Sequence, residues 1–202
     1  MASSYPIPAA EAAVELRFKN SRFIGATAAA ATVEEARAFI GRRRRDYPNA
    51  GHHVYAFAVG YGDSVVHGRS DDGEPAGTAG RPLLAVVQGA ELGDVVVVIT
   101  RYFGGTKLGT GGLVKAYTET AQAVLAQVPR QLKVDMVAAR LVLPYGVYKS
   151  CRMLIDAVDG EIEEENFAGA VDLRFRVSVE RLEELRQAVR EATAGRVSLE
   201  SG

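Results

Sequence analysis

The chain has 202 residues, of which 48% are hydrophobic and 24% are charged, and its formal net charge at pH 7 is −1. This length allows one large domain or two small ones, each with a hydrophobic core. The near-zero net charge excludes a polycation that coats nucleic acid over its whole surface, so any phosphate contact has to come from a local patch.

Cysteine usage and hydropathy indicate the compartment. Cys151 is the only cysteine, which excludes an internal disulfide and a thiolate metal cluster. The N-terminal residues lack the basic and apolar regions of a secretory signal. No apolar run approaches the roughly 20 residues that span a bilayer. We therefore expect a cytoplasmic protein with no membrane partner.

The first part of the chain predicts two hairpins with a helix between them. Apolar and alternating runs predict strands over residues 14–18, 23–30, 53–59 and 64–67. Thr32, with Glu35 three residues later, predicts a capping box that opens the helix. Four adjacent arginines, 42–45, fall in or just past its last turn. A solvated face that complements the helix dipole is favoured for them over a nucleic-acid contact.

The three histidines, His52, His53 and His67, fall on the second hairpin. Neighbours on a strand point to opposite faces, so His52 and His53 cannot readily share a metal ion. A site built from one of them with His67 and Asp71 or Asp72 is an open alternative. Structural histidines are favoured, and we predict no metal site.

Residues 69–82, RSDDGEPAGTAGRP, predict an irregular loop because glycine, proline and aspartate are dense there. Its carboxylates, Asp71, Asp72 and Glu74, suit a divalent cation or acid–base chemistry. The favoured alternative is structural: the carboxylates accept backbone N–H bonds and pair with the arginines of the loop, Arg69 and Arg81. A short helix over 83–87 follows.

Residues 95–99, VVVVI, predict a strand in the middle of a sheet that is covered on both faces. A glycine-rich turn then leads into a helix over 113–128. Glycine permits positive φ and close approach of the backbone to another group. We predict that five glycines fill this turn: Gly104, Gly105, Gly109, Gly111 and Gly112.

This turn predicts an anion-binding corner. A helix N-terminus offers unpaired N–H groups and partial positive charge, and the predicted cations around it are Arg101, Lys107, Lys115 and Arg81. Tyr102 and Phe103 supply stacking surfaces, or else they are core residues beneath the loop. The spacing excludes a Walker A motif, since Thr110 stands at the lysine position, and a dinucleotide fingerprint, since Val114 replaces the third glycine.

Pro129 breaks the helix, and we predict a domain boundary there, giving domains 1–129 and 130–202 of an α+β protein. In the second domain we predict strands and helices over residues 137–143, 146–158, 161–166, 171–179, 181–194 and near 197. This βαββαβ order is the ferredoxin-like pattern. Its sheet has one open face, which carries Arg174 and Arg176 if helices do not cover it. Cys151 is predicted to be a core residue.

Two stretches, residues 71–82 (DDGEPAGTAGRP) and 93–117 (GDVVVVITRYFGGTKLGTGGLVKAY), closely resemble the signature of the YigZ/IMPACT family. Residues 21–25 (SRFIG) and the histidine pair 52–53 are also similar to it. The resemblance covers the whole first domain. The second domain is similar, more loosely, to the small C-terminal domain of the bacterial members.

The resemblance implies a fold for each domain. The first is expected to be like the second domain of a small-subunit ribosomal protein and domain IV of elongation factor G, and the second like domain V of that factor. The glycine-rich loop is also similar to that of GHMP small-molecule kinases, which share the first fold. For bacterial members the resemblance implies binding to nucleic acid or the ribosome, without an established reaction.

We therefore expect a non-enzymatic RNA- or ribosome-binding protein that modulates translation, without catalytic residues or a cofactor. One alternative is an enzyme acting on a phosphorylated small molecule or nucleotide, in which Asp71, Asp72 or Glu74 is a metal ligand or base opposite the glycine-rich loop. A second alternative is a protein-interaction scaffold, in which the glycines serve tight turns and Asp71, Asp72 and Glu74 pair with Arg69, Arg81 or Arg101. The partner is then a protein.

Overall fold

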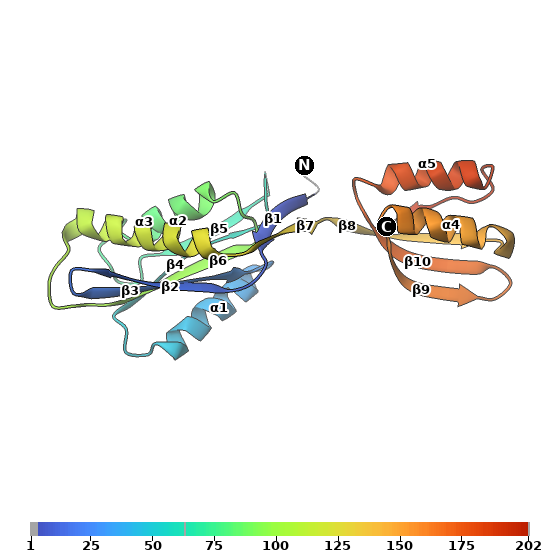
Figure 1. Ribbon diagram of the computed structural model, residues 1–202. Helices are drawn as coiled ribbons and strands as arrows, with labels where there is room; N and C mark the ends of the chain where they lie inside the picture. The colour runs from blue at the N-terminus through green and yellow to red at the C-terminus, as the bar shows by residue number, and fades with distance from the viewer. Residues whose placement is uncertain (1–3, 63, 202) are drawn as a thin grey trace. The chain divides into compact units, whose positions relative to one another are not determined.

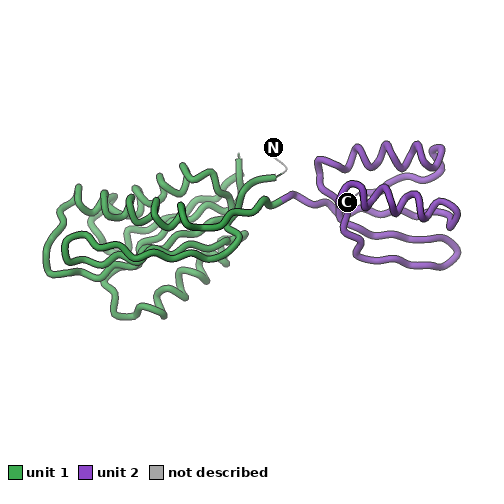
Figure 2. The backbone as a smooth tube through the Cα atoms, viewed as in Figure 1, with its two compact units in different colours: residues 1–133 green, residues 134–202 purple. Residues whose placement is uncertain are grey.

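The structure, a computed structural model, describes residues 4–62 and 64–201. The chain divides into two compact units, residues 1–133 and 134–202 (Figure 2). Both mix helices with antiparallel strands, so the predicted α+β class is confirmed. Among the helices of the described residues, none is long and apolar enough to cross a membrane.

Unit 1 is built on a five-stranded antiparallel sheet of order β2-β3-β6-β4-β5 (Figure 1). These strands are β2 (Ala12–Phe18), β3 (Ser21–Ala29), β4 (His52–Val59), β5 (Val66–Ser70) and β6 (Val95–Tyr102). Both predicted hairpins are present, as the β2–β3 and β4–β5 pairs. A separate two-stranded sheet joins β1 (Ser4–Pro8) to β7 (Arg130–Val134).

Helices cover both faces of this sheet (Figure 1). Helix α1 (Val33–Asp46) packs on one face, and α2 (Gly80–Gly89) and α3 (Gly109–Gln127) pack on the other. Strand β6 serves both cores because its side chains alternate: Val95, Val97 and Ile99 contact the α2–α3 layer, whereas Val96 and Val98 contact the α1 layer. The predicted central strand with two covered faces is therefore confirmed.

Unit 2 is a four-stranded antiparallel sheet of order β11-β8-β10-β9 with two helices. Its elements are β8 (Met136–Leu143), α4 (Tyr145–Ala157), β9 (Glu161–Phe167), β10 (Val171–Ser178), α5 (Leu182–Ala192) and β11 (Glu200–Ser201). This is the predicted βαββαβ order. Cys151 lies in the core, where burial raises the pKa of its thiol. Arg174 and Arg176 are exposed on the other face of β10, as predicted.

Four details differ from the sequence prediction. Strands β1 and β7 were not predicted, and through β7 unit 1 extends to Lys133, four residues beyond the predicted boundary. Helix α2 begins at Gly80 rather than at residue 83. The last strand is β11, beyond the predicted position near 197. The strand predicted over 171–179 ends at Ser178 as β10, and Val179 beyond it is 50% exposed.

Candidate functional site

The glycine-rich turn is shorter than predicted. Strand β6 continues through Tyr102, and α3 already begins at Gly109. Only Gly104 and Gly105 of the five glycines therefore lie in the turn, while Gly109, Gly111 and Gly112 belong to the first helical residues. Gly109 has φ of +77°, a conformation that glycine adopts without steric cost.

The turn packs closely against the β2–β3 hairpin. A Cβ atom on Gly104 would lie 2.0 Å from the carbonyl carbon and oxygen of Asn20, so only glycine fits at this contact. The Gly104 N–H donates to Ser21 Oγ over 3.2 Å. Lys19 Nζ donates to the Lys107 carbonyl oxygen over 3.1 Å. Lys19 was missing from the predicted site, because 88 residues separate it from Lys107 and no local spacing connects them.

The N-terminus of α3 is electropositive. No side chain caps it, and its first turn contains no acidic residue. Its orphan N–H groups and the helix dipole therefore favour an anion. Lys107 is exposed, and Lys115, 69% exposed, lies 3.7 Å from Glu119. We call the surface formed by Lys19, Phe103, Lys107, Lys115 and the first turn of α3 the α3 corner.

The two predicted stacking residues differ in exposure. Phe103 is 57% exposed, and the Arg101 guanidinium lies 5.7 Å from the centre of its ring. Phe103 is therefore available to a ligand at the α3 corner. Tyr102 is half-buried, with the Arg22 guanidinium 5.5 Å from its ring, so it presents less surface than Phe103 does.

Arg101 is not part of the exposed corner. It lies within β6, and its side chain is only 7% exposed. Its Nη1 donates to Glu74 Oε1 over 2.6 Å, and the Glu74 side chain is 3% exposed. The structure thus places Arg101 in an internal ion pair and not among the cations of the helix N-terminus. A pair between Arg101 and a loop carboxylate is the arrangement that the scaffold alternative predicted.

Two further side chains surround this pair. The Tyr117 hydroxyl donates to the same Glu74 oxygen over 2.7 Å. Burial, together with the neighbouring Glu74 charge, raises the pKa of Tyr117 far above its usual value, so the phenol stays protonated and remains a donor. His52 Nε2 lies 3.9 Å from the other carboxylate oxygen of Glu74.

The remaining carboxylates of the acidic loop also have internal partners. Asp71 accepts N–H bonds from Gly77, Ala79 and Gly80. Burial raises the pKa of Asp71, but these N–H bonds outweigh it and hold the pKa below its usual value. Asp72 accepts from the His53 N–H and from Arg44, each over 2.6 Å. The carboxylates of the loop therefore accept backbone N–H bonds and form ion pairs, as the structural alternative predicted. Asp72, however, pairs with Arg44 and not with an arginine of the loop.

The histidines have structural contacts. His52 Nδ1 lies 2.8 Å from the Asp72 carbonyl oxygen, and His53 Nδ1 lies 3.2 Å from Thr100 Oγ1. Burial lowers the pKa of His53. His67 lies on β5, opposite Ala58. Over residues 4–62 and 64–201, no three His, Cys, Asp or Glu side chains are grouped closely enough to hold a metal ion.

The arginine run on α1 is largely paired within the chain. Arg42 pairs with Glu11, Arg43 with Asp46 and Arg44 with Asp72. The guanidiniums of Arg42 and Arg43 also lie over the Phe39 and Tyr47 rings. Three of the four charges thus have acidic partners inside the molecule, which agrees with the structural alternative for this run.

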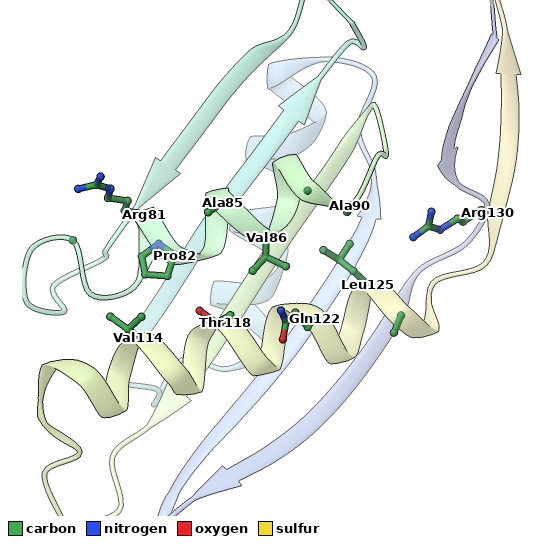
Figure 3. A pocket seen from close by; sticks show the side chains of 13 residues that line it. Arg81, Pro82, Ala85, Val86, Ala90, Val114, Thr118, Gln122, Leu125 and Arg130 are labelled. Carbon is green, nitrogen blue, oxygen red and sulfur yellow. The ribbon is translucent and has the colours of Figure 1, made fainter.

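Arg81 lies apart from the glycine-rich turn, at the start of α2. It is exposed and lines a groove between α2 and α3, together with Pro82, Val86, Val114 and Leu125 (Figure 3). Of the predicted site residues, Lys107 and the glycines lie in the turn and first residues of α3, and Lys115 lies in the second turn of that helix near Glu119. Arg81 lies in the groove, Glu74 is buried, and Asp71 and Asp72 are half-buried in the contacts described above.

Comparison with known proteins identifies the family. Residues 19–125 match the Impact N-terminal domain, and residues 141–196 match a domain of unknown function, DUF1949. An IMPACT family member from Haemophilus influenzae is 36% identical over 199 residues, which are 98% of this chain and 97% of the relative. The IMPACT family member YigZ of Escherichia coli is 38% identical over 197 residues, 97% of each chain.

The fold is also found in a solved structure. A crystal structure of a hypothetical protein, 37% identical, matches with a TM-score of 0.74 over 98% of this chain and 97% of its own. The two domain matches and the two relatives agree with the resemblance seen in the glycine-rich and acidic stretches. This chain belongs to the IMPACT family.

Proposed function

We propose that this protein is a non-enzymatic RNA- or ribosome-binding protein that modulates translation, and that it contacts phosphates at the α3 corner. The observation that carries the proposal is the uncapped N-terminus of α3, which is preceded in the same turn by the exposed Lys107 and the exposed Phe103. Phosphate contacts from lysines and helix N–H groups provide affinity, and an exposed ring provides a stacking surface for an unpaired base.

Family membership supports a role in translation. The resemblance of the two domains to domains IV and V of elongation factor G adds to this support, since that factor works on the ribosome. We also propose that unit 1 has the fold of domain IV of elongation factor G and that unit 2 has the fold of domain V. The site within unit 1 would then be the α3 corner.

No observation favours the alternative of an enzyme acting on a phosphorylated molecule. That mechanism requires Asp71, Asp72 or Glu74 to face the glycine-rich loop across a cleft. In the structure Asp71 binds N–H groups at the start of α2 and Asp72 binds Arg44. Glu74 binds the Arg101 guanidinium and the Tyr117 hydroxyl. Their charges are already balanced by groups of the protein itself.

The test is the fluorescence anisotropy of a labelled structured RNA at several salt concentrations. A plot of log K against log salt has a negative slope, and each lost phosphate contact makes this slope shallower by about 0.7–0.9. Lys107→Ala/Lys115→Ala is therefore expected to weaken binding and to make the slope shallower by roughly 1.4–1.8. The control is Lys149→Ala/Arg37→Ala, which removes the same charge from exposed positions elsewhere and should leave the slope unchanged.

The aromatic contribution is tested in the same assay. Phe103→Ala is expected to lose about 1–3 kcal/mol of binding free energy without changing the salt slope. Phe167→Ala is the matched control, because Phe167 is 54% exposed but lies in unit 2. Equal affinities of wild type and both α3-corner variants, or the absence of RNA binding at low salt, would refute the proposal.

A further inference from the structure

A groove runs between α2 and α3 on the helical face of unit 1 (Figure 3). It has a volume of about 840 Å³. It is hollow because small residues line it, with Ala85 on α2, Ala90 just after α2 and Ala126 on α3. Val114 is 38% exposed at one end, and Leu125 lies toward the other. An apolar floor of this kind leaves hydrocarbon surface that a partner can cover.

The charges of the groove are all of one sign. Arg81 and Arg130 lie at its opposite ends (Figure 3), and its lining contains no carboxylate. Both side chains are exposed, and neither forms an ion pair within the part of the chain that the structure describes. Many other arginines of the chain have acidic partners, so these two are available to an anionic ligand.

The length of the groove indicates the length of its ligand. From Val114 to Ala126, α3 rises by about 18 Å at 1.5 Å per residue. A ligand that reaches both guanidiniums is therefore elongated and anionic near both ends, and its middle meets a mostly apolar lining that also contains Thr118 and Gln122 (Figure 3). A helix in a groove formed by two other helices is a common mode of peptide recognition, with anchors at positions i, i+3, i+4 and i+7.

The chemistry of the lining favours a peptide over RNA. A single strand needs aromatic surfaces for its bases and a track of cations for its phosphates. This lining contains no aromatic residue, and its two cations are separated by a mostly apolar stretch in which Thr118 and Gln122 are the only polar side chains. A nucleic acid would leave that stretch uncovered, whereas leucine-like anchors would bury it.

We propose that this groove binds an amphipathic helical segment of a protein partner, which carries apolar anchors on one face and acidic side chains about 12 residues apart. This inference does not depend on RNA binding, because Lys107, Lys115 and Phe103 do not line the groove. The two sites can therefore be tested separately.

The first experiment selects ligands from a displayed library of random 16-residue peptides on the full chain. We expect the enriched peptides to combine helically spaced apolar residues with Asp or Glu near both ends. Their binding should weaken at least 10-fold on Arg81→Glu/Arg130→Glu. The control variant is Arg37→Glu/Arg45→Glu, which reverses two exposed charges on α1, on the other face of the sheet, and it should bind like wild type.

The second experiment swaps the charges. An enriched peptide whose acidic ends are replaced by lysine should bind Arg81→Glu/Arg130→Glu more tightly than it binds wild type. Ala85→Trp, which fills the hollow without a change of charge, should also weaken the original peptide at least 10-fold. Circular dichroism melting of every variant checks that it is folded, and both altered positions of the charge-reversed variant are exposed.

Three results would overturn this inference. The first is a library that yields no enriched peptide, and the second is a set of enriched peptides without acidic residues. The third is equal binding to wild type and the charge-reversed variant. Single-stranded RNA that displaces an enriched peptide from wild type and fails to bind Arg81→Glu/Arg130→Glu would assign the groove to nucleic acid, which also contradicts the proposal.

Discussion

Glu74 and Arg101 are opposite full charges in a place that is almost closed to solvent, since neither side chain is more than 7% exposed. Removal of two charges from water costs several kcal/mol per ion, and their attraction offsets this cost only when the remaining polar atoms are also paired. The Tyr117 hydroxyl donates a second hydrogen bond to the Glu74 carboxylate, whereas Nε of Arg101 is buried without a hydrogen-bond partner. Removal of either residue alone would therefore leave an uncompensated buried charge and destabilise unit 1.

We predict that Arg101→Met lowers the free energy of unfolding of unit 1 by about 3–5 kcal/mol, because it leaves a buried carboxylate without its cation. Glu74→Leu/Arg101→Met should lose less, because it removes both charges together. Urea denaturation followed by circular dichroism, with hydrogen exchange of β6 as a local probe, measures this cycle. An Arg101→Met variant within 1 kcal/mol of wild type would contradict the assignment.

The position of Arg101 also shows a limit of sequence reasoning. Because Arg101 comes just after the predicted strand 95–99 and just before the glycine-rich turn, it was predicted to be a cation of the anion-binding corner, and only the scaffold alternative paired it with a loop carboxylate. Its burial depends on Glu74, which is 27 residues away in a loop without regular structure. No local spacing identifies that partner, whereas the cation and the carboxylate were each recognisable as residues of interest.

At the scale of the element, Asp71 serves as a distant cap for α2. The residue before this helix is Ala79, which has no side-chain acceptor. Asp71 Oδ1 accepts the N–H groups of Ala79 and Gly80 instead, over 3.1 and 2.7 Å. A loop carboxylate thus satisfies donors that a local serine or aspartate satisfies in most helices.

We predict that Asp71→Asn lowers stability by about 1 kcal/mol at neutral pH, because the amide has no charge and only one acceptor oxygen for the three N–H groups that the carboxylate binds. The folded-state pKa of Asp71 is lowered, so its contribution is present above the unfolded pKa of about 3.9. It is lost as the pH falls through the folded pKa. Urea titrations between pH 3 and 7 should show the gap between wild type and variant closing below about pH 4.

Asp156→Asn is the control for this measurement, since Asp156 is 54% exposed in a surface pair with Arg152 and such pairs contribute little. A gap that does not change with pH would contradict the capping role of the Asp71 charge.

Elements were predictable where their signals are local. Thr32 accepts from the Glu35 N–H, and the Glu35 carboxylate accepts from Ala31, so the start of α1 was predicted closely. Helix α2 was predicted to start three residues late, because its cap is nonlocal. Strands β1 and β7 were missed because they pair only with each other, and β1 contains two prolines. The α3 corner was predicted in part, without Lys19.

At the scale of the whole molecule, each unit has its own core. Leu141, Phe175 and Ile155 belong to the core of unit 2, and the layers on both faces of β6 belong to unit 1. The end of unit 1 is fixed by Lys133, whose Nζ lies 2.6 Å from the buried Asp94. Tyr5 and the Gly60 N–H also donate to this carboxylate.

We predict that a fragment of residues 134–202 folds alone and melts cooperatively, because a compact unit with its own core is expected to do so. A fragment of residues 1–134 should be clearly more stable than one of residues 1–129. The shorter fragment lacks β7 and leaves the Asp94 carboxylate without the Lys133 charge. Circular dichroism melting compares them, and equal midpoints for the two N-terminal fragments would show that β7 has no role in unit 1.

The alternation of side chains along β6 constrains how this sequence can vary over evolutionary time. One strand supplies Val97 to the α2–α3 layer and Val96 and Val98 to the α1 layer, while it is hydrogen-bonded to β3 and β4 on its two edges. A single inserted or deleted residue would exchange the two layers and shift both registers at once. We therefore expect length changes between homologues to fall in the connecting loops, and the buried valines of β6 to vary only among apolar side chains of similar size.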